Sequence, residues 1–321
     1  MTLTTRPLGA DGPHVSAIGL GCMSASWAYY LGTRDDEESV RVFERALELG
    51  VTHLDTASMY GPELNERLVG RAIRAGRNGA VVASKAGLVV EDAARRIVRR
   101  DGTPATLRRF CEGSLERLGV ETIDLYYLHR VDPEVPVEES IGALSELVAE
   151  GKVRRVGISE CTLDELRRAH ATHPIAALQS ELSLWTRDPL ENGTLAWCAE
   201  HGAAFVAFGV LGRGYLPGTM PAETVFPPAD FRAANPRFTP QAMRANEQLV
   251  ARIRVVAERR GAAIAHVLIA WVLALGEHVL AIPGTKQRAY LDENVGADGL
   301  VLSAEDLAEL DALPAAVGSR Y

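Results

Sequence analysis

The stretch HLDTASMYGPELNE, residues 53–66, runs from a short apolar strand into a turn and then into the start of a helix. The strand ends in Asp55, and Tyr60 follows inside a Met-Tyr-Gly-Pro turn. A carboxylate and a phenol placed together at a strand end belong either to a solvated turn or to a binding or catalytic site. The sequence on both sides of this stretch distinguishes the two interpretations.

Strand-like runs of the same kind recur along the chain and alternate with amphipathic helical patterns such as DDEESVRVFERALELG and VPVEESIGALSELVAEGK. The runs are short and continuously apolar, which is typical of parallel strands that helices cover on the outside. Glycines end several of the helical patterns, as expected at helix C-termini. The predicted strands span residues 16–21, 51–56, 80–85, 123–129, 153–159, 176–182, 204–210 and 279–284.

This alternation predicts an α/β protein, a single (β/α)₈ TIM barrel that occupies residues 1–321 as one domain. No charge block or Pro/Ser-rich linker divides the chain. Residues 3–21 are expected to begin with an N-terminal β-hairpin that closes the bottom of the barrel. Residues 211–240, rich in Gly, Pro and Phe, are expected to form a long loop after strand seven. A doubly wound sheet is the alternative, but GLGCMS lacks the third glycine of the GxGxxG fingerprint.

The composition of the chain excludes several classes of function. With a formal net charge of -8, the protein lacks the basic face that a general nucleic-acid or anionic-membrane binder needs. The sequence has no membrane-spanning apolar run and no signal core, so we expect a cytoplasmic protein. No Cys-x-x-Cys pair occurs, and we expect reduced thiols rather than disulfides or a metal site. The four cysteines are Cys22, Cys111, Cys161 and Cys198.

Polar and aromatic residues stand at the ends of consecutive predicted strands. In a (β/α)₈ barrel these ends converge on one face, where polar residues tend to be catalytic. Taken singly, Asp55 could cap a helix, Lys85 could reach solvent and His129 could be a satisfied core histidine. In one central pocket, however, unpaired charges are costly, so we expect these groups to be partners for one another. The full set is Asp55, Lys85, His129, Ser159, Glu160, Gln179 and Phe208.

These residue types suit the transfer of a proton to an oxygen. A tyrosine phenol has an ordinary pKa of about 10, too high for efficient proton exchange at neutral pH. We expect Lys85 to lower the pKa of Tyr60, and Asp55 to keep the lysine charged and oriented. His129 would orient the substrate oxygen or share its proton. The sequence has no HExxH, GxSxG or Walker-type motif, so another group must supply electrons or a nucleophile.

Asp55, Tyr60, Lys85 and His129, in that order and strand context, closely resemble the catalytic tetrad of the aldo-keto reductase superfamily. Matching segments extend over essentially the whole chain and include GLGCMS, ALELGVTHLDTASMYG, VVASKAG, GSLERLGVETIDLYYLHRVDP, EGKVRRVGISE, LGRGYLPG and AIPGTKQRAYLDENVGA. The resemblance implies a barrel that binds NADPH in extended form across its mouth. It further implies that hydride passes to an aldehyde or ketone carbon while Tyr60 protonates the oxygen.

The resemblance also implies which residues bind the cofactor. Glu160 stands where many relatives have Asn, and Phe208 where the family usually stacks a Tyr on the nicotinamide ring. Lys286 and Arg288 would supply charge to the 2′-phosphate, because the Arg often found nearby is Tyr290 here. The expected contacts are Ser159, Glu160, Gln179 and Phe208 for nicotinamide, Leu211, Gly212 and Arg213 for pyrophosphate, and Gly284, Lys286, Arg288, Glu293 and Asn294 for the adenosine end.

Loops are expected to select the substrate, which the resemblance implies is a small carbonyl compound. The aromatic cluster SWAYY follows the first barrel strand and indicates either a flat substrate or an ordinary packed loop. Leu182 and Gly209 depart from the family pattern, and both changes are expected to make the site more apolar. Gly209 is also expected to loosen its loop. The predicted substrate-pocket residues are Met23, Trp27, Tyr29 and Tyr30.

Two alternatives to a carbonyl reductase remain open. Lys85 on the same barrel could form a Schiff base with a carbonyl substrate, as in a lyase that needs no nicotinamide. A catalytically weak nucleotide-binding regulatory subunit is the second, since some members of this superfamily bind nucleotide to regulate a partner. The sequence identifies neither the physiological carbonyl nor whether the protein is a monomer or a homo-oligomer.

Overall fold

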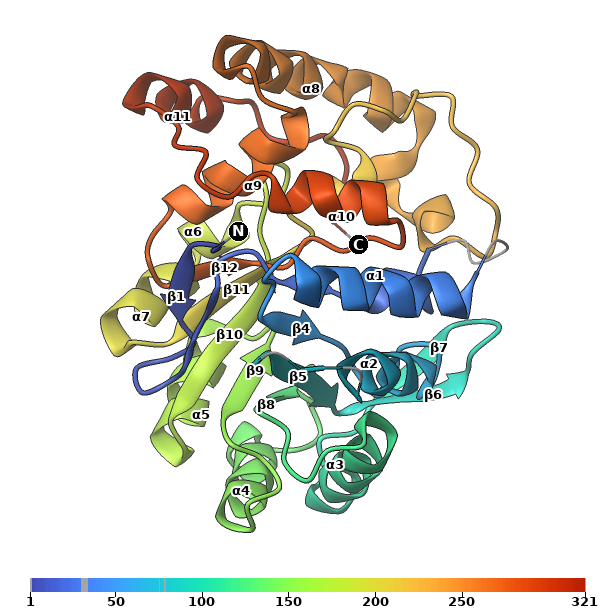
Figure 1. The fold of residues 1–321 in the computed structure, drawn as a ribbon, viewed down its shortest axis with the longest axis vertical. Helices are drawn as coiled ribbons and strands as arrows, with labels where there is room; N and C mark the ends of the chain where they lie inside the picture. Colours follow the sequence, from blue (N-terminus) through green and yellow to red (C-terminus); the bar gives the residue numbers. More distant parts are fainter. Residues whose placement is uncertain (1, 30–33, 75, 78, 321) are drawn as a thin grey trace.

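Parallel strands curl into a closed barrel at the centre of the molecule (Figure 1). This computed structural model describes residues 2–29, 34–74, 76, 77 and 79–320. A hydrogen bond from the Gly19 N–H to the Ala281 carbonyl, and a bridge between Gly21 and Gly284, close the barrel between its first and last strands. The predicted (β/α)₈ barrel is therefore confirmed. In sheet order its strands are β3 (Leu20–Gly21), β4 (His53–Asp55), β5 (Val81–Ala86), β8 (Leu125–Leu128), β9 (Val156–Ser159), β10 (Ile175–Glu181), β11 (Ala204–Phe208) and β12 (Val279–Ala281).

Helices surround the barrel and bury one apolar face each against it (Figure 1). Asp35 caps the first of these helices, because its carboxylate accepts the backbone N–H of Glu38 at 2.9 Å. Gly119 ends another in the left-handed conformation, with φ 69°. The surrounding helices are α1 (Asp36–Glu48), α2 (Leu64–Arg74), α3 (Pro104–Leu118), α4 (Val137–Ala149), α5 (Leu163–Thr172), α7 (Thr194–His201), α9 (Ile264–Ala274) and α10 (Arg288–Val295).

The predicted N-terminal hairpin is present and consists of β1 (Thr5–Pro7) and β2 (His14–Ser16). Leu8 and Val15 from this hairpin are buried in the same cluster as the barrel-lining side chains of β5, β8, β10 and β11. The hairpin thus fills the end of the barrel at which the parallel strands begin. The opposite end, where the strands finish, is left for the loops that carry polar residues.

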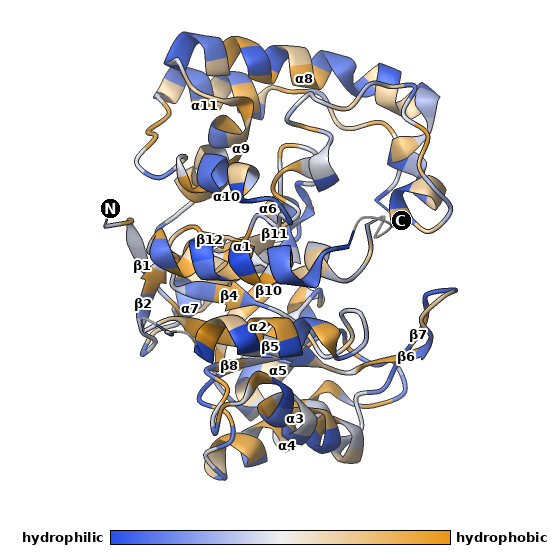
Figure 2. Cartoon of the chain, turned by 45° about the vertical axis from the view of Figure 1, so that its right-hand side comes forward, coloured by the Kyte–Doolittle hydropathy of each residue, from blue (hydrophilic) through white to orange (hydrophobic). Residues whose placement is uncertain are grey.

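Several elements lie outside the barrel. The loop after β11 contains 3₁₀ turns η2 (Gly212–Gly214), η3 (Phe231–Ala234) and η4 (Pro236–Phe238), and it leads into α8 (Pro240–Arg260). A hairpin of β6 (Leu88–Asp92) and β7 (Ile97–Arg100) was not predicted, and it reaches outward from the barrel in Figure 2. Short segments complete the chain: η1 (Met23–Ala25), α6 (Asp188–Glu191) and α11 (Ala304–Asp311).

Two observations concern expectations drawn from composition. All four cysteines are free thiols, and three of them are buried. Within the described part of the chain, no helix combines the length and the apolar character needed to cross a membrane. Most of the predicted strands are longer than the observed ones, and much of the excess lies where the strands begin: the predicted runs 123–129 and 153–159 start at Leu125 and Val156, with only an isolated bridge between Ile123 and Val153 before them.

A buried histidine makes the stability of this core depend on pH. His53 begins β4, is fully buried, and neither ring nitrogen has a hydrogen-bond partner among the described residues. Burial, the largest cause, lowers the pKa of His53 to about 4 from an ordinary value of 6.5. Between these two values the unfolded chain binds a proton that the folded chain does not, so the native state loses stability as the pH falls from 6.5 to 4.

We therefore predict that, between pH 7 and pH 4, the free energy of unfolding falls by about 3 kcal/mol less in His53→Leu than in the wild type. The measurement is urea unfolding of the wild type and the variant across this range. The expected result is a free energy of unfolding that falls less steeply in the variant. Equal slopes for the two proteins would show that His53 is protonated in the folded state.

Candidate active site

A lysine at the end of β5 organises the polar residues at the mouth of the barrel. Lys85 is fully buried, and its ammonium donates to Asp55 Oδ1, to the carbonyl oxygen of Thr56 at 2.7 Å, and toward the Tyr60 hydroxyl at 3.5 Å. An ammonium has three N–H donors, so these contacts match its full capacity. The fold thus brings the Lys85 ammonium together with the Asp55 carboxylate and the Tyr60 phenol, which lie 30 and 25 residues away in the sequence.

Asp55 is held from the opposite side of the barrel as well. The side-chain amide of Gln179, on β10, donates to Asp55 Oδ2 at 2.7 Å, and both side chains are buried. Each carboxylate oxygen therefore has a separate donor. This arrangement satisfies a charge whose burial would otherwise be costly, and it fixes the orientation of the carboxylate toward Lys85.

The turn that carries Tyr60 is pinned by a fully buried asparagine. The Asn65 side chain donates to the Cys22 carbonyl at 2.9 Å and to Ser26 Oγ at 2.7 Å, and it accepts from Thr56 Oγ1 at 2.7 Å. Gly61, next to Tyr60, has φ 68°, and a Cβ there would lie 2.8 Å from Ser26 atoms. The turn thus requires glycine at this position and holds the phenol above Lys85.

His129 follows β8 and faces the same phenol. Its ring meets the Tyr60 ring edge to face, with centroids 5.9 Å apart and an interplanar angle of 84°. Burial, and then the charges of Arg130 and Lys85, lower the pKa of His129 well below its ordinary range. The imidazole is therefore neutral, and Nδ1 is buried without a partner among the described residues. A neutral ring of this kind can orient an oxygen by a hydrogen bond.

The electrostatics of the pair Lys85 and Tyr60 differ from expectation in one respect. Burial alone would lower the pKa of Lys85, but the charges of Asp55 and Tyr60 outweigh it and raise that pKa. Burial raises the pKa of Tyr60, and the Lys85 ammonium offsets only part of the rise. Lys85 thus acts on the Tyr60 pKa in the expected direction, but the net pKa of Tyr60 is raised in this state because the phenol is only 7% exposed.

A second group of charges lies at the ends of β9, β10 and β11; of the predicted nicotinamide contacts, Glu160 and Phe208 contact it, whereas Gln179 donates to Asp55. Glu160 and Glu181 both pair with Arg320 from the C-terminal segment, which also lies over the Phe208 ring. Ser159 Oγ accepts from Arg130 at 3.1 Å. Sequence analysis missed Glu181, although it lies two residues after Gln179 on the same face of β10.

The predicted pyrophosphate loop follows β11. Leu211 precedes the turn of Gly212 and Arg213, and the Arg213 guanidinium pairs with Glu181 at 2.9 Å. Gly209 has φ 67°, a left-handed backbone conformation that favours glycine. The loop thus places the Arg213 guanidinium and a tight backbone turn at the mouth of the barrel.

The predicted adenosine contacts lie apart from the tetrad, in the segment that follows β12. The bridge to Gly21 brings Gly284 beside the first barrel strand. Arg288 begins α10 and pairs with Glu38 of α1 at 2.9 Å, and Lys286 lies just before it. Glu293 is partly buried, and Asn294 is buried, on the same helix.

Two of the four predicted substrate residues belong to an apolar wall beside Tyr60. Met23 and Trp27 pack against the cluster of Met59 and Tyr60. Tyr29 instead contacts the loop after β11, edge to face with Phe231 at 5.2 Å. Tyr30 lies outside the described residues. Side chains of the unpredicted β6–β7 hairpin complete the wall: Leu88, Val90 and Val98.

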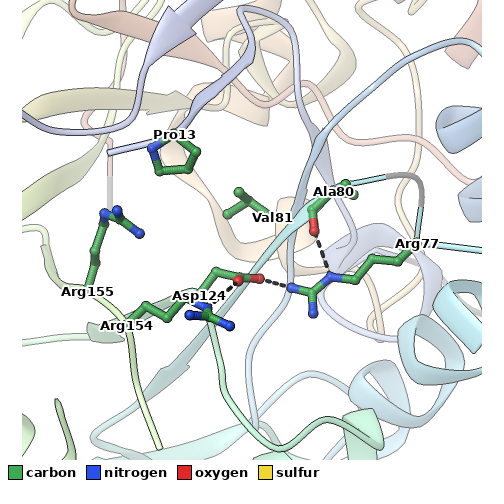
Figure 3. A pocket seen from close by; sticks show the side chains of 8 residues that line it. Pro13, Arg77, Ala80, Val81, Asp124, Arg154 and Arg155 are labelled. Carbon is green, nitrogen blue, oxygen red and sulfur yellow. Dashed lines mark hydrogen bonds and ion pairs between the residues drawn. The ribbon is translucent and has the colours of Figure 1, made fainter. Parts of the chain in front are cut away.

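A separate hollow of about 340 Å³ lies at the other end of the barrel (Figure 3). Its lining includes Arg77, Asp124, Arg154 and Arg155, and Asp124 pairs with both Arg77 and Arg154. None of the predicted site residues lines it. Because β5 begins there, at Val81, this hollow is remote from the polar strand ends described above.

Comparison with known proteins defines the class to which this fold and site belong. A model of the Aldo/keto reductase family matches residues 17–315. The chain is 42% identical over 320 residues to probable aldo-keto reductase 1 of Glycine max, covering 98% of this chain and 90% of that protein. The chain therefore belongs to the aldo/keto reductase family, a family of oxidoreductases, and the resemblance noted in the sequence is confirmed.

Solved structures agree with this assignment. Glycerol dehydrogenase AKR11B4 from Gluconobacter oxydans is 34% identical, with a TM-score of 0.83 over 96% of this chain and 94% of that one. An aldo/keto reductase from Klebsiella pneumoniae in complex with NADP and acetate is 28% identical, with a TM-score of 0.72 over 95% and 94% of the two chains. Aldo-keto reductase AKR11C1 from Bacillus halodurans, in its holo form, is 27% identical, with a TM-score of 0.80 over 99% and 98%.

The geometry predicts how the buried ion pair contributes to stability. Lys85→Met should lower the free energy of unfolding by about 3–5 kcal/mol, because Asp55 is left buried without its ammonium. The double variant Lys85→Met/Asp55→Leu should recover most of that loss. Urea unfolding at neutral pH measures both values.

A second lysine provides a matched control for this prediction. Lys152 pairs at the surface with Glu112 at 2.7 Å and Glu150 at 3.0 Å, so Lys152→Met should lower the free energy of unfolding far less than Lys85→Met does. A double variant as unstable as Lys85→Met alone would contradict the account, since the loss would then not arise from an unpaired Asp55.

Proposed function

We propose that this protein reduces an aldehyde or ketone to an alcohol with NADPH as the hydride donor, and that Tyr60 is the proton donor. The observation that carries the proposal is the contact of one buried ammonium, Lys85, with both Asp55 and the Tyr60 hydroxyl. A phenol beside a fixed cation can release its proton to a substrate oxygen, because the cation stabilises the phenolate that remains.

Each member of the tetrad has a distinct part in the proposed reaction. Tyr60 donates a hydrogen bond and then its proton to the carbonyl oxygen. Lys85 stabilises the resulting phenolate, and Asp55 keeps Lys85 charged. His129, which is neutral, orients the oxygen by a hydrogen bond. NADPH, when bound, supplies the hydride to the carbonyl carbon.

The residues present fit a bound dinucleotide. Ser24 Oγ and His129 Nδ1 are buried without partners among the described residues, and Ser24 lies beside Gly284. The Phe208 ring is partly exposed at the end of β11, where it can stack on a flat heterocycle. In the proposal Arg213 lies near the pyrophosphate, while Lys286 and Arg288 lie near the 2′-phosphate. Structures of two relatives, both aldo-keto reductases of Klebsiella pneumoniae, contain NADP or NADPH.

The substrate proposed for this site is a small carbonyl compound with an apolar or aromatic substituent. The wall of Trp27, Met59 and Val90 offers few polar partners beside Tyr60. Apolar surface is therefore expected to contribute binding energy, while the tetrad recognises the carbonyl oxygen.

We also propose that residues 1–321 function as one domain, since the family model extends over residues 17–315.

The two alternatives find less support. A Schiff-base lyase needs a neutral lysine amine as nucleophile, whereas the pKa of Lys85 is raised and its donors are engaged. A regulatory subunit does not need the geometry of a proton donor, yet Tyr60 and Lys85 lie within 3.5 Å of each other. The carbonyl reductase therefore accounts for more of the site.

The proposed role of Tyr60 predicts a specific separation of binding from turnover. Tyr60→Phe should lower kcat for carbonyl reduction by at least about 100-fold, since the general acid is lost. The dissociation constant for NADPH should change by less than about threefold, because the proposed cofactor contacts are elsewhere. Loss of nicotinamide absorbance with a panel of aldehydes, quinones and ketones measures turnover, and protein fluorescence quenching measures binding. Retention of wild-type kcat would remove Tyr60 from its role.

A further inference from the structure

A cluster of four charged side chains lies at the end of β10, where the C-terminal segment crosses the mouth of the barrel. Arg320 donates to Glu181 Oε2 at 2.7 Å and pairs with Glu160 Oε1 at 2.6 Å. Arg213 pairs with Glu181 Oε2 at 2.9 Å. The Glu181 side chain is only 2% exposed, and Arg320 is 18% exposed. These are charge-assisted contacts in a largely water-excluded place, where each is stronger than at a surface.

Glu160 has an unusual conformation and an uneven set of partners. Its φ of 53° lies in the left-handed region, which is uncommon for a residue with a side chain and is frequent at functional sites. Oε1 accepts from the Ser180 hydroxyl at 2.9 Å and from the Glu181 backbone N–H at 2.8 Å, in addition to Arg320. Oε2 has no partner among the described residues, so it is the acceptor available to a ligand.

The charge on Glu160 depends on Arg320. Burial alone would raise the pKa of Glu160, but the hydrogen bond and charge of Arg320, together with Arg130 and the Glu181 backbone N–H, lower it overall. The nearby acid Glu181 would disfavour a second negative charge if Arg320 and Arg213 were absent. Arg320 thus stabilises the ionised form of a largely buried carboxylate.

We infer that Arg320 is a positioning residue for the cofactor, acting through Glu160 and Phe208. This inference rests on the proposed function, in which both residues contact nicotinamide. Arg320 fixes Glu160 through Oε1, so that Oε2 can accept the N–H₂ of the nicotinamide carboxamide. Its guanidinium carbon lies 5.9 Å from the Phe208 ring centroid and supports one face of that ring, leaving the other for nicotinamide.

The inference predicts a loss of cofactor affinity without a matching loss of chemistry. Arg320→Ala should raise the dissociation constant and KM for NADPH by about tenfold or more, since hydrogen bonds to a charged group are removed. The kcat at saturating NADPH should stay within about threefold, because the tetrad is untouched. Arg320→Lys keeps the charge but not the paired geometry, and should lie between wild type and Arg320→Ala.

The experiment measures NADPH binding by fluorescence, then kcat and KM, for the full-length wild type and variants. Ethylguanidinium added to Arg320→Ala should restore part of the affinity, which a purely structural defect would not allow. Arg259→Ala is the matched control: this arginine pairs with Asp306 at 3.0 Å and Glu309 at 2.7 Å, away from the site, and its loss should leave NADPH affinity unchanged.

Several results would overturn the inference. Unchanged NADPH binding by Arg320→Ala would overturn it. Tighter NADPH binding would also overturn it, by showing that the C-terminal segment competes with the cofactor. A loss shared equally by Arg259→Ala, or one without guanidinium rescue, would also do so. These outcomes differ from a failure of the proposed function. If the wild type binds NADPH but reduces no carbonyl compound, the proposed function is wrong, yet the NADPH dissociation constants of the wild type and Arg320→Ala still test the role of Arg320.

Discussion

The buried ion pair between Lys85 and Asp55 is the interaction on which the rest of the site depends. Two charges inside a barrel are tolerated only if each is fully matched by partners. The lysine has a carboxylate, a backbone carbonyl and a phenol as acceptors, and Asp55 has a second donor from β10. The same contacts that stabilise the buried charges also place the Lys85 ammonium next to the Tyr60 hydroxyl, so one arrangement serves both stability and the proposed chemistry.

The barrel supplies this arrangement through topology, and the loops refine it. Parallel strands end at the same face, so Asp55 and Lys85 meet without any local signal between them. The turn after β4 needs more: a buried Asn65 and a glycine at Gly61 hold Tyr60 in place. Outside this centre, the C-terminal segment adds Arg320, and the β6–β7 hairpin adds apolar surface. The groups proposed to react are thus held by the barrel and the turn after β4, while loops contribute the surfaces proposed to bind ligands.

Much of this could be predicted from the sequence, and the exceptions have physical reasons. Strand and helix periodicity predicted the barrel, and the strand ends predicted that Asp55, Lys85 and His129 lie at one face of it, because both depend on local pattern and regular topology. The hairpin of β6 and β7 was missed since its residues are half exposed and show no clean alternation. Arg320 was missed because it meets Glu181 139 residues away, a contact that only the tertiary fold defines. The sequence predicted that Lys85 lowers the pKa of Tyr60, but not that burial outweighs this effect, because sequence spacing does not report depth of burial.

The central claim is that the site joins hydride transfer from nicotinamide to proton donation by Tyr60 under the control of Lys85. Isotope transfer tests it most directly, with NADPH carrying deuterium at both C4 hydrogens and an aldehyde as substrate in ordinary water. The expected product of the wild type is an alcohol with one deuterium on the carbinol carbon, which Tyr60→Phe should form at least about 100-fold more slowly. An unlabelled alcohol, or a substrate adduct trapped on Lys85 by borohydride in the absence of NADPH, would contradict it.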